Sequence, residues 1–288
     1  MAPPRVGERP LNAADFEHFR RLVRGRSGLA LTAEKDYLVT SRLAAIARSE
    51  GTDVGALLAR LRTGAPEDLI RRCVNAMATH ESFFFRDGTP FELLTREVLP
   101  HLLAARAARR SLRIWCAACS SGQEPYSVAM VLQEHGAQLA GWNVEIVATD
   151  MSEDILAKAQ GGLYSEFEVR RGLSEDRLRR WFGPEERNWR ISPALRQMVQ
   201  FRPHNLLHGA GGLGVFDVIF CRNVLIYFEV EQKRMILADL ARALAGDGAL
   251  FLGSAETVLG VTEAFQLTPG VAGLFRPTGG AEPLARTA

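Results

Sequence analysis

The sequence predicts an α/β protein: a parallel β-sheet covered by helices on both faces, with a small all-helical segment before it and a small β-subdomain inserted into it. Three observations predict this fold class. Residues 11 to about 74 show helical periodicity, and no strand signal precedes residue 110. Short apolar runs then alternate with helical stretches, as in parallel sheets. Residues 161–204 interrupt that alternation and are too long for a simple crossover.

The N-terminal region predicts four helices. The first has apolar side chains at helical spacing, including Phe16, Phe19 and Val23. Residues that favour helix starts precede each segment. In chain order these are Asn12 or Asp15, Thr32 with Lys35, Thr52-Asp53, and Pro66.

The rest of the chain predicts the sheet and its helices. Strands are expected at residues 112–117, 144–149, 216–221 and 249–252, and helices at 125–137, 152–160 and 229–245, the last ended by Gly246. Segments around 265–267 and 273–275 suit an antiparallel hairpin at the sheet edge. Within the insertion, residues 189–201 are typical of short strands around Ser192-Pro193. Residues 1–10 and 278–288 are expected to be flexible tails.

Composition excludes several protein classes. The 288 residues carry a net charge of +2, and 47% are hydrophobic, which argues against disorder, a collagen-like chain and a large nucleic-acid-binding surface. No apolar run is long enough for a membrane span, and the start lacks the apolar core of a secretory signal, so we expect a cytoplasmic protein. Residues 1–80 nevertheless hold 13 basic and 9 acidic side chains, a surplus that the remainder lacks.

The segment after the first predicted strand has the features of a cofactor site. A turn of small residues ends at Gly122, Pro125 opens a helix, and Asp150 ends the second strand, where a carboxylate can bind both hydroxyls of a ribose. The glycine pattern of a dinucleotide site is absent, which disfavours a nicotinamide oxidoreductase. Glu124 suits a ligand that is cationic at this end, such as S-adenosylmethionine; alternatively it only complements the helix dipole.

Two further segments supply candidate residues. THESFFFRD, residues 79–87, joins the helical region to the sheet region, and FCRNVLIYF, residues 220–228, follows a predicted strand whose carboxyl end faces the ligand crevice. Cys116 and Cys119 have redox or zinc spacing, but no second pair exists, so a packing role is favoured. The six histidines are scattered, and we predict no metal.

Together these motifs, with CSSGQEPYS, ATDMSEDILAKA and FRPHNL, resemble those of the chemotaxis receptor methyltransferase (CheR) family over about residues 11–277. The resemblance implies a Rossmann-like class I methyltransferase sheet. It also implies a helical receptor-contact domain at residues 11–78 and an S-adenosylmethionine-dependent domain at 79–277 with an inserted subdomain at about 161–204.

The resemblance carries the family's site residues to this sequence. Arg86 and Tyr227 match the pair facing the transferred methyl group. His80 and Ser82 stand where some members have Asn and Thr. The implied cofactor contacts are His80, Ser82, Arg86, Glu124, Asp150, Asn205, Leu206, Arg222 and Asn223.

The implied activity is methyl transfer from S-adenosylmethionine to glutamate carboxylates of chemoreceptor cytoplasmic helices, leaving S-adenosylhomocysteine. The alternatives are a cofactor-binding receptor module without transfer, and a nucleic-acid or small-molecule methyltransferase on the same fold. A monomer is expected, without nucleic-acid binding or membrane insertion. The segment 182–189 lacks a Gly-rich turn, which disfavours binding of a receptor tether. The expected receptor contacts are Lys35, Arg42 and Arg48, then Arg20, Arg21 and Arg24.

Overall fold

The computed structural model describes residues 11–32, 34 and 36–279. They belong to two compact units, one comprising Met1–Thr79 with Tyr227–Glu229 and the other His80–Ile226 with Val230–Ala288. The tail predicted at residues 1–10, most of the tail predicted at 278–288, and Lys35 lie outside the described residues. Among the helices described, none is long and apolar enough to cross a membrane.

The described part of the N-terminal unit contains the four predicted helices. Asn12, rather than Asp15, caps the first helix by accepting hydrogen bonds from two backbone N–H groups, and Asp53 caps the third. Phe19, Val23 and Leu43 are fully buried in the core that the helices share. The helices are α1 (Ala13–Ser27), α2 (Asp36–Ser49), α3 (Val54–Thr63) and α4 (Glu67–Ala76).

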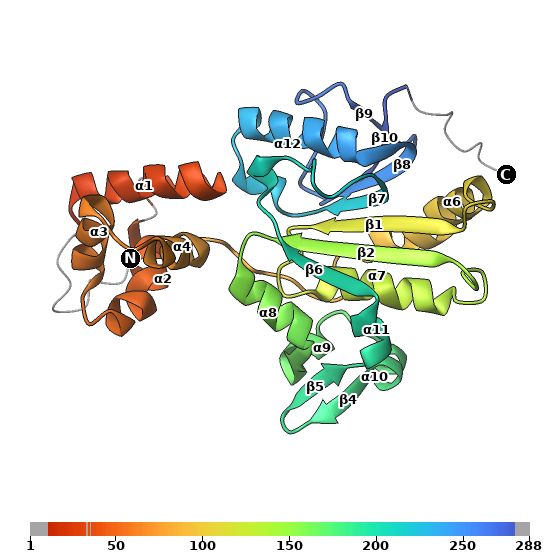
Figure 1. Cartoon of the computed structure of the whole chain (residues 1–288), viewed down its shortest axis with the longest axis horizontal. Helices are drawn as coiled ribbons and strands as arrows, with labels where there is room; N and C mark the ends of the chain where they lie inside the picture. Colours follow the sequence, from red (N-terminus) through yellow and green to blue (C-terminus); the bar gives the residue numbers. More distant parts are fainter. Residues whose placement is uncertain (1–10, 33, 35, 280–288) are drawn as a thin grey trace. The chain divides into compact units, whose positions relative to one another are not determined.

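The second unit is built on a seven-stranded sheet with the order β6-β2-β1-β7-β8-β10-β9. Helices α7 (Gln123–Glu134) and α8 (Glu153–Gly161) lie on one side of the sheet and α12 (Val230–Ala243) on the other (Figure 1). The predicted α/β class is therefore confirmed. The strands are β1 (Ser111–Ala117), β2 (Asn143–Asp150), β6 (Val199–Pro203), β7 (Phe216–Cys221), β8 (Leu244–Leu252), β9 (Phe265–Leu267) and β10 (Leu274–Pro277).

Two sequence expectations for the sheet are wrong. Residues 199–201, assigned to the inserted subdomain, form part of β6, which pairs in parallel with β2 at one edge of the large sheet. The helix expected over 229–245 is shorter: α12 ends at Ala243, and β8 begins at Leu244 instead of at the expected residue 249. The expected hairpin is present: β10 pairs antiparallel with β9 at the opposite edge and with β8 on its inner side.

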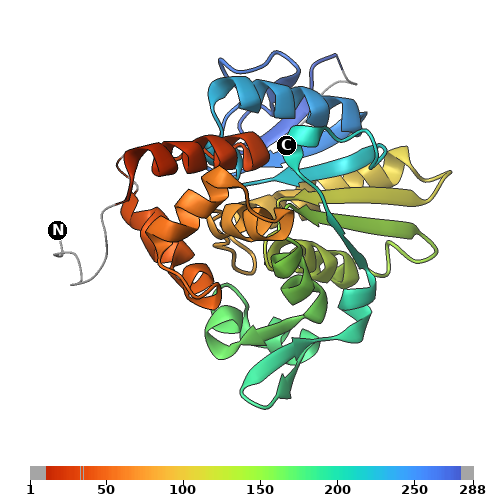
Figure 2. The ribbon, with the colours of Figure 1, turned by 60° about the vertical axis from the view of Figure 1, so that its left-hand side comes forward.

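The inserted subdomain is a three-stranded sheet with short helices. Its strand order is β3-β5-β4, with antiparallel pairing throughout. These strands lie beside α9 and α10 on the α8 side of the large sheet (Figures 1 and 2). The elements are β3 (Leu163–Ser165), α9 (Glu166–Arg170), α10 (Glu175–Trp181), β4 (Phe182–Glu185), β5 (Asn188–Ile191) and α11 (Pro193–Gln197).

A helical segment that the sequence patterns did not identify leads into β1. It runs through α5 (Thr89–Leu93), a π-helical turn η2 (Leu94–Val98) and α6 (Leu99–Ala105). Leu94, Val98 and Leu102 are fully buried and belong to the same apolar cluster as the inner residues of β1. The segment therefore covers part of the sheet face.

A buried ion network joins this segment to two strands. The Arg106 guanidinium donates to Asp217 at 2.8 Å and forms two hydrogen bonds with Asp247. The second carboxylate oxygen of Asp217 accepts from the backbone N–H of Arg113 at 2.8 Å. The guanidinium beside Asp247 holds the pKa of that carboxyl below its usual range. The network thus ties the ends of β1, β7 and β8 together.

Replacement of Asp247 by Asn is expected to lower the free energy of unfolding by about 1–3 kcal/mol at pH 7. A lowered pKa in the folded state stabilises the protein above the carboxyl's usual pKa, and the gain is lost as pH falls through the folded-state value. Urea unfolding from pH 7 to pH 2.5 should therefore show wild type and Asp247→Asn converging in acid. Asp239→Asn is the matched control, because Asp239 pairs with the exposed Arg242. A constant difference at every pH would contradict this reasoning.

Candidate cofactor and catalytic site

The turn between β1 and α7 is held in a conformation that few residues adopt. Ala118, Ser120 and Gly122 all have positive φ angles, of 54°, 51° and 91°. A Cβ added at Gly122 would lie 2.9 Å from the Cβ of Ala159 and 3.2 Å from the Tyr164 hydroxyl. Strain of this kind concentrates at functional sites, and only glycine fits the last position.

Asp150 and His80 both meet this turn at Ser120. The Asp150 carboxylate accepts from the Ser120 backbone N–H at 2.9 Å and, through its other oxygen, from the Ser152 N–H at 3.0 Å. The Ser120 hydroxyl donates to the His80 carbonyl at 3.2 Å. Each carboxylate oxygen keeps a lone pair for a further donor. The structure thus brings the residue predicted to bind ribose to the strained turn.

Arg222 is the buried centre of a charge cluster in which Asp87 is exposed. It follows β7, and its guanidinium donates to Glu124 at 2.8 Å, to Asp87 at 2.7 Å and to the carbonyl of Arg86 at 2.9 Å. The Arg222 side chain is only 1% exposed, and its Nε has no hydrogen-bond partner among the described residues. Arg222 therefore fixes two of the predicted site segments relative to one another, and sequence reasoning missed the contribution of Asp87.

Glu124 is a buried carboxyl in an unusual electrostatic environment. Burial raises the pKa of Glu124 above its usual value, although the Arg222 guanidinium favours the ionised form. A positive charge placed beside this carboxyl would favour ionisation further. Glu124 is thus paired with a buried cation in addition to standing in the first turn of α7, and its binding of a cationic ligand stays a prediction.

A second carboxylate, which sequence reasoning missed, orders the loop after β7. Glu256 accepts hydrogen bonds of 2.6–2.8 Å from four backbone N–H groups, those of Asn223, Val224, Leu225 and Gly253. Asn223 has a φ of 59°, and a Cβ at Gly253 would lie 2.6 Å from the side-chain nitrogen Nδ2 of Asn223. Glu256 follows β8 at the carboxyl edge of the sheet, so the rule that selected Arg222 also applies to it.

The segment 80–87 is anchored by its middle aromatic residue. Phe84 is fully buried, with its ring 5.0 Å from that of Tyr164, while the Phe85 N–H donates to the Ser127 hydroxyl at 3.0 Å. The Arg86 guanidinium lies 5.4 Å from the Phe83 ring and donates to the Glu81 carbonyl at 3.0 Å. Ser82 is half-buried. Phe84 and Phe85 therefore fix the position of the backbone that carries Arg86 and Asp87.

The remaining predicted residues occupy two loops. The Asn205 side chain accepts from the Leu207 N–H at 3.0 Å and caps a short 3₁₀ helix, η3 (Leu206–His208), in which Leu206 is buried. Tyr227 ends the 3₁₀ helix η4 (Leu225–Tyr227), is half-buried and groups with the N-terminal unit. The pairing of Arg86 with Tyr227 therefore stays a prediction.

The cysteines are buried and unbonded. Cys116 lies in β1, and burial raises the pKa of its thiol and that of Cys119 well above the usual value. Burial also raises the pKa of Cys73 to about 11. None of these thiols is activated as a nucleophile. Within residues 11–279, apart from 33 and 35, no three His, Cys, Asp or Glu side chains are arranged to hold a metal ion.

Comparison with known proteins matches both parts of the chain. Residues 14–78 match the domain described as "CheR methyltransferase, all-alpha domain", and residues 80–273 match "CheR methyltransferase, SAM binding domain". Chemotaxis protein methyltransferase 1 of Pseudomonas aeruginosa is 43% identical over 272 residues, which cover 90% of this chain and 96% of that protein.

Two other relatives agree. Chemotaxis protein methyltransferase Cher2 of Pseudomonas putida is 40% identical, over 89% of this chain and 96% of its own length. The chemotaxis protein methyltransferase of Escherichia coli is 35% identical, over 89% of each chain. The predicted family, its methyltransferase fold and its cofactor are thus confirmed, and the chain belongs to the CheR family of S-adenosylmethionine-dependent chemotaxis methyltransferases.

Proposed function

We propose that this methyltransferase converts glutamate side chains on cytoplasmic helices of chemoreceptors into methyl esters. The observation that carries the proposal is the Glu124–Arg222–Asp87 cluster around the buried Arg222, which ties the Arg86 turn to Glu124, beside a site suited to a cationic cofactor. The printed names of the relatives, chemotaxis protein methyltransferases, supply the class of substrate.

The residues present fit S-adenosylmethionine. Its ribose hydroxyls suit the Asp150 carboxylate, and its positive end suits Glu124, whose pKa burial has raised. The turn between them is built from small residues and packs closely at Gly122, so a ligand could approach its backbone. When bound, the cofactor supplies an electrophilic methyl group on a sulfonium. We assign further contacts to the backbone and side chains of His80, Ser82, Asn205, Leu206 and Asn223.

The chemistry needs positioning more than activation. A glutamate carboxylate is already ionised at neutral pH, so no nucleophilic thiol or strong base is required. Arg86 would hold the attacking carboxylate in line with the methyl group. Tyr227 would orient either that carboxylate or the methyl group. Arg222, which is buried behind Arg86 and Glu124, acts as a positioning residue.

Replacement of Arg86 by Ala is expected to lower the rate of methyl transfer at least about 100-fold, the typical cost of losing a group that positions a reactant. Although the resemblance also implies a cofactor contact for Arg86, affinity for S-adenosylhomocysteine should change less than about tenfold, because the Arg86 guanidinium donates to the Glu81 carbonyl and makes no hydrogen bond with Glu124 or Asp150. Isothermal titration and a methyl-transfer assay would measure the two quantities. Arg96→Ala, on the exposed surface of η2, is the control. Full activity of Arg86→Ala would rule out this role.

The basic N-terminal residues differ in their surroundings. Arg48 is exposed and makes no hydrogen bond or ion pair with the residues described. Arg42 instead donates to the carbonyls of Met77 and Ala78 and to the Thr79 hydroxyl, so it holds the chain after α4. Arg20 and Arg24 are paired with Glu17 and Glu229. We therefore place the receptor contact on Arg48, with the exposed Arg21 second.

Charge reversal at Arg48 is expected to weaken binding to a receptor cytoplasmic fragment about five- to fiftyfold, mainly at low salt, because it opposes an acidic surface with like charge. Fluorescence anisotropy with the labelled fragment would measure the Kd at 20 and 300 mM NaCl. Arg96→Glu makes the same charge change on the second unit and should have little effect. Equal weakening by both variants would point to net charge rather than to a contact at Arg48.

One experiment tests the proposed function as a whole. The protein is incubated with tritiated-methyl S-adenosylmethionine and a receptor cytoplasmic fragment, and the label is tested for release by base. Base-labile label that disappears when the receptor glutamates are replaced by alanine identifies glutamate esters. Cofactor and receptor binding without label would instead favour a receptor module without transferase activity, and base-stable label would exclude an ester.

A further inference from the structure

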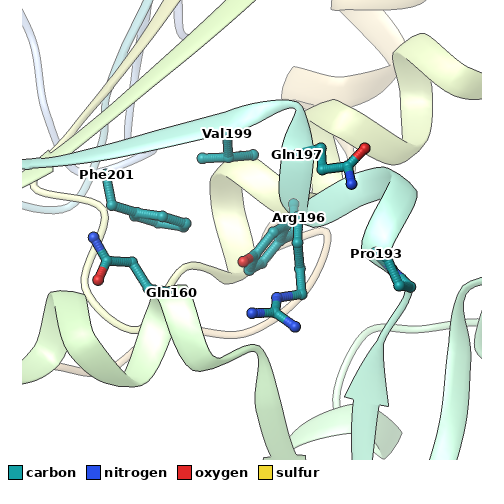
Figure 3. A pocket seen from close by; sticks show the side chains of 7 residues that line it. Gln160, Pro193, Arg196, Gln197, Val199 and Phe201 are labelled. Carbon is teal, nitrogen blue, oxygen red and sulfur yellow. The ribbon is translucent and has the colours of Figure 1, made fainter.

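A pocket of about 350 Å³ lies at the β6 edge of the large sheet, away from the Glu124–Arg222–Asp87 cluster. It opens between α7, α8, α11 and β6 (Figure 3). Such a volume is within the range of small-molecule sites. Its lining consists of Tyr126, Gln160, Pro193, Arg196, Gln197, Val199 and Phe201.

Arg196 supplies the only charge in this lining, and the charge is unpaired. The guanidinium extends into the open space between Gln160 and Pro193 (Figure 3). Its Nε is buried and has no hydrogen-bond partner, and no carboxylate of the residues described lies within ion-pair distance. Glu185, whose charge acts on Arg196 from farther away, is already held by two hydrogen bonds from Arg190. The terminal nitrogens of this guanidinium make no hydrogen bond with the residues described, so their N–H groups can donate to an external acceptor.

The rest of the lining is neutral and largely apolar. Val199 and Phe201 alternate along β6 and so present their side chains to the same face. The Tyr126 hydroxyl donates to the Ala159 carbonyl at 2.9 Å, and its fully buried ring packs behind that of Phe201 at 5.6 Å; burial raises the pKa of this tyrosine. Gln160 and Gln197 add uncharged donors and acceptors at the rim. The pocket therefore pairs one fixed positive charge with aromatic and aliphatic walls.

We propose that this pocket binds a small organic carboxylate that carries a flat apolar body. The two carboxylate oxygens would accept from the two terminal nitrogens of the Arg196 guanidinium, Nη1 and Nη2, in a bidentate manner. The apolar body would lie against Phe201 and Val199, with Tyr126 supporting Phe201 from behind. The site shares no residue with the proposed methyl-transfer site, so the two proposals stand or fall separately.

Titration of the full chain with benzoate, followed by ligand-observed NMR and isothermal titration, tests the proposal without any cofactor. We expect a Kd on the order of 1 mM, typical of a nine-atom ligand. Benzamide, which has the same shape without the charge, should bind at least about tenfold more weakly. Arg196→Gln should weaken benzoate binding by a similar factor, while Arg187→Gln, at an exposed arginine of the β4–β5 turn, should not change it.

A second variant tests the pocket independently, in case Arg196→Gln fails to fold. Gln160→Glu keeps Arg196 but places a carboxylate opposite it, and should exclude benzoate while leaving the circular dichroism spectrum unchanged. The proposal is overturned if benzamide binds as tightly as benzoate, or if both variants retain wild-type affinity. Inorganic phosphate that binds as tightly as benzoate would also overturn it, because the apolar walls would then contribute nothing.

Discussion

Replacement of Arg222 by methionine is expected to abolish detectable methyl transfer and to lower the free energy of unfolding by about 3–5 kcal/mol. Methionine keeps much of the volume of the side chain but removes its charge. Glu124 and Asp87 would then lose the cation that compensates them, and the Arg86 carbonyl would lose its donor. The loss in stability includes the desolvation penalty of the groups that remain unpaired, in addition to the energy of the broken hydrogen bonds.

The reason for the loss of activity is electrostatic. Without Arg222, the pKa of Glu124 would rise further, because burial would act on it with less opposition. The more of Glu124 is protonated, the weaker is its attraction for a positively charged ligand. Affinity for the uncharged S-adenosylhomocysteine should therefore fall less than affinity for S-adenosylmethionine. A merely structural role would lower both affinities equally.

A double variant separates the charge effect from general damage. Adding Glu124→Gln to Arg222→Met removes the uncompensated carboxylate and should recover part of the lost stability at pH 7. A raised folded-state pKa destabilises an acid as pH rises through it, so Arg222→Met alone should gain stability on acidification from pH 7 to pH 5, whereas the double variant should not. Urea unfolding at the two pH values measures this. Additive losses in the double variant would contradict the charge argument.

The sequence predicted the central strands of the sheet better than its outer elements. Central strands such as β1 and β7 are buried on both faces, so their continuous apolar runs are visible without any knowledge of neighbours. β6 is an edge strand in which only Val199 and Phe201 point inward, and it directly follows α11 of the insertion. Its membership of the large sheet depends on pairing with β2, a long-range contact that no local pattern encodes.

The same distinction explains which site residues were found. Asp150 and Arg222 end strands and lie within motifs, so their position at the ligand edge follows from the chain alone. Asp87 contributes only because its turn reaches Arg222, 135 residues later. Glu256 also follows the carboxyl end of a strand and could have been selected on that ground. It comes after a loop of small residues, however, and belongs to no recognised motif. Sequence thus predicts candidate residues at strand ends and in motifs, and the structure adds the residues that hold them in place.

Glu256 provides the second large expected effect. Replacement of Glu256 by alanine leaves the N–H groups of Asn223, Val224, Leu225 and Gly253 without their acceptor. Hydrogen bonds to charged groups contribute about 1.5–3 kcal/mol each, but those made by one carboxylate are not additive, so we expect a loss of about 3–5 kcal/mol in the free energy of unfolding. Urea unfolding would measure it, with the exposed Glu263→Ala as control.

Glutamine at position 256 makes the sharper test of why the carboxylate is needed. Its amide is nearly the same shape, but one of its two ends is a donor, which would face the N–H groups of one pair, either Val224 and Leu225 or Asn223 and Gly253. Glu256→Gln should therefore fold with a loss of about 1–3 kcal/mol and still lose at least about tenfold in methyl transfer, because the loop carrying Arg222 and Asn223 would be displaced. Since Glu256 lies behind that loop, a purely stabilising role would leave the activity of the folded Glu256→Gln protein at the wild-type level.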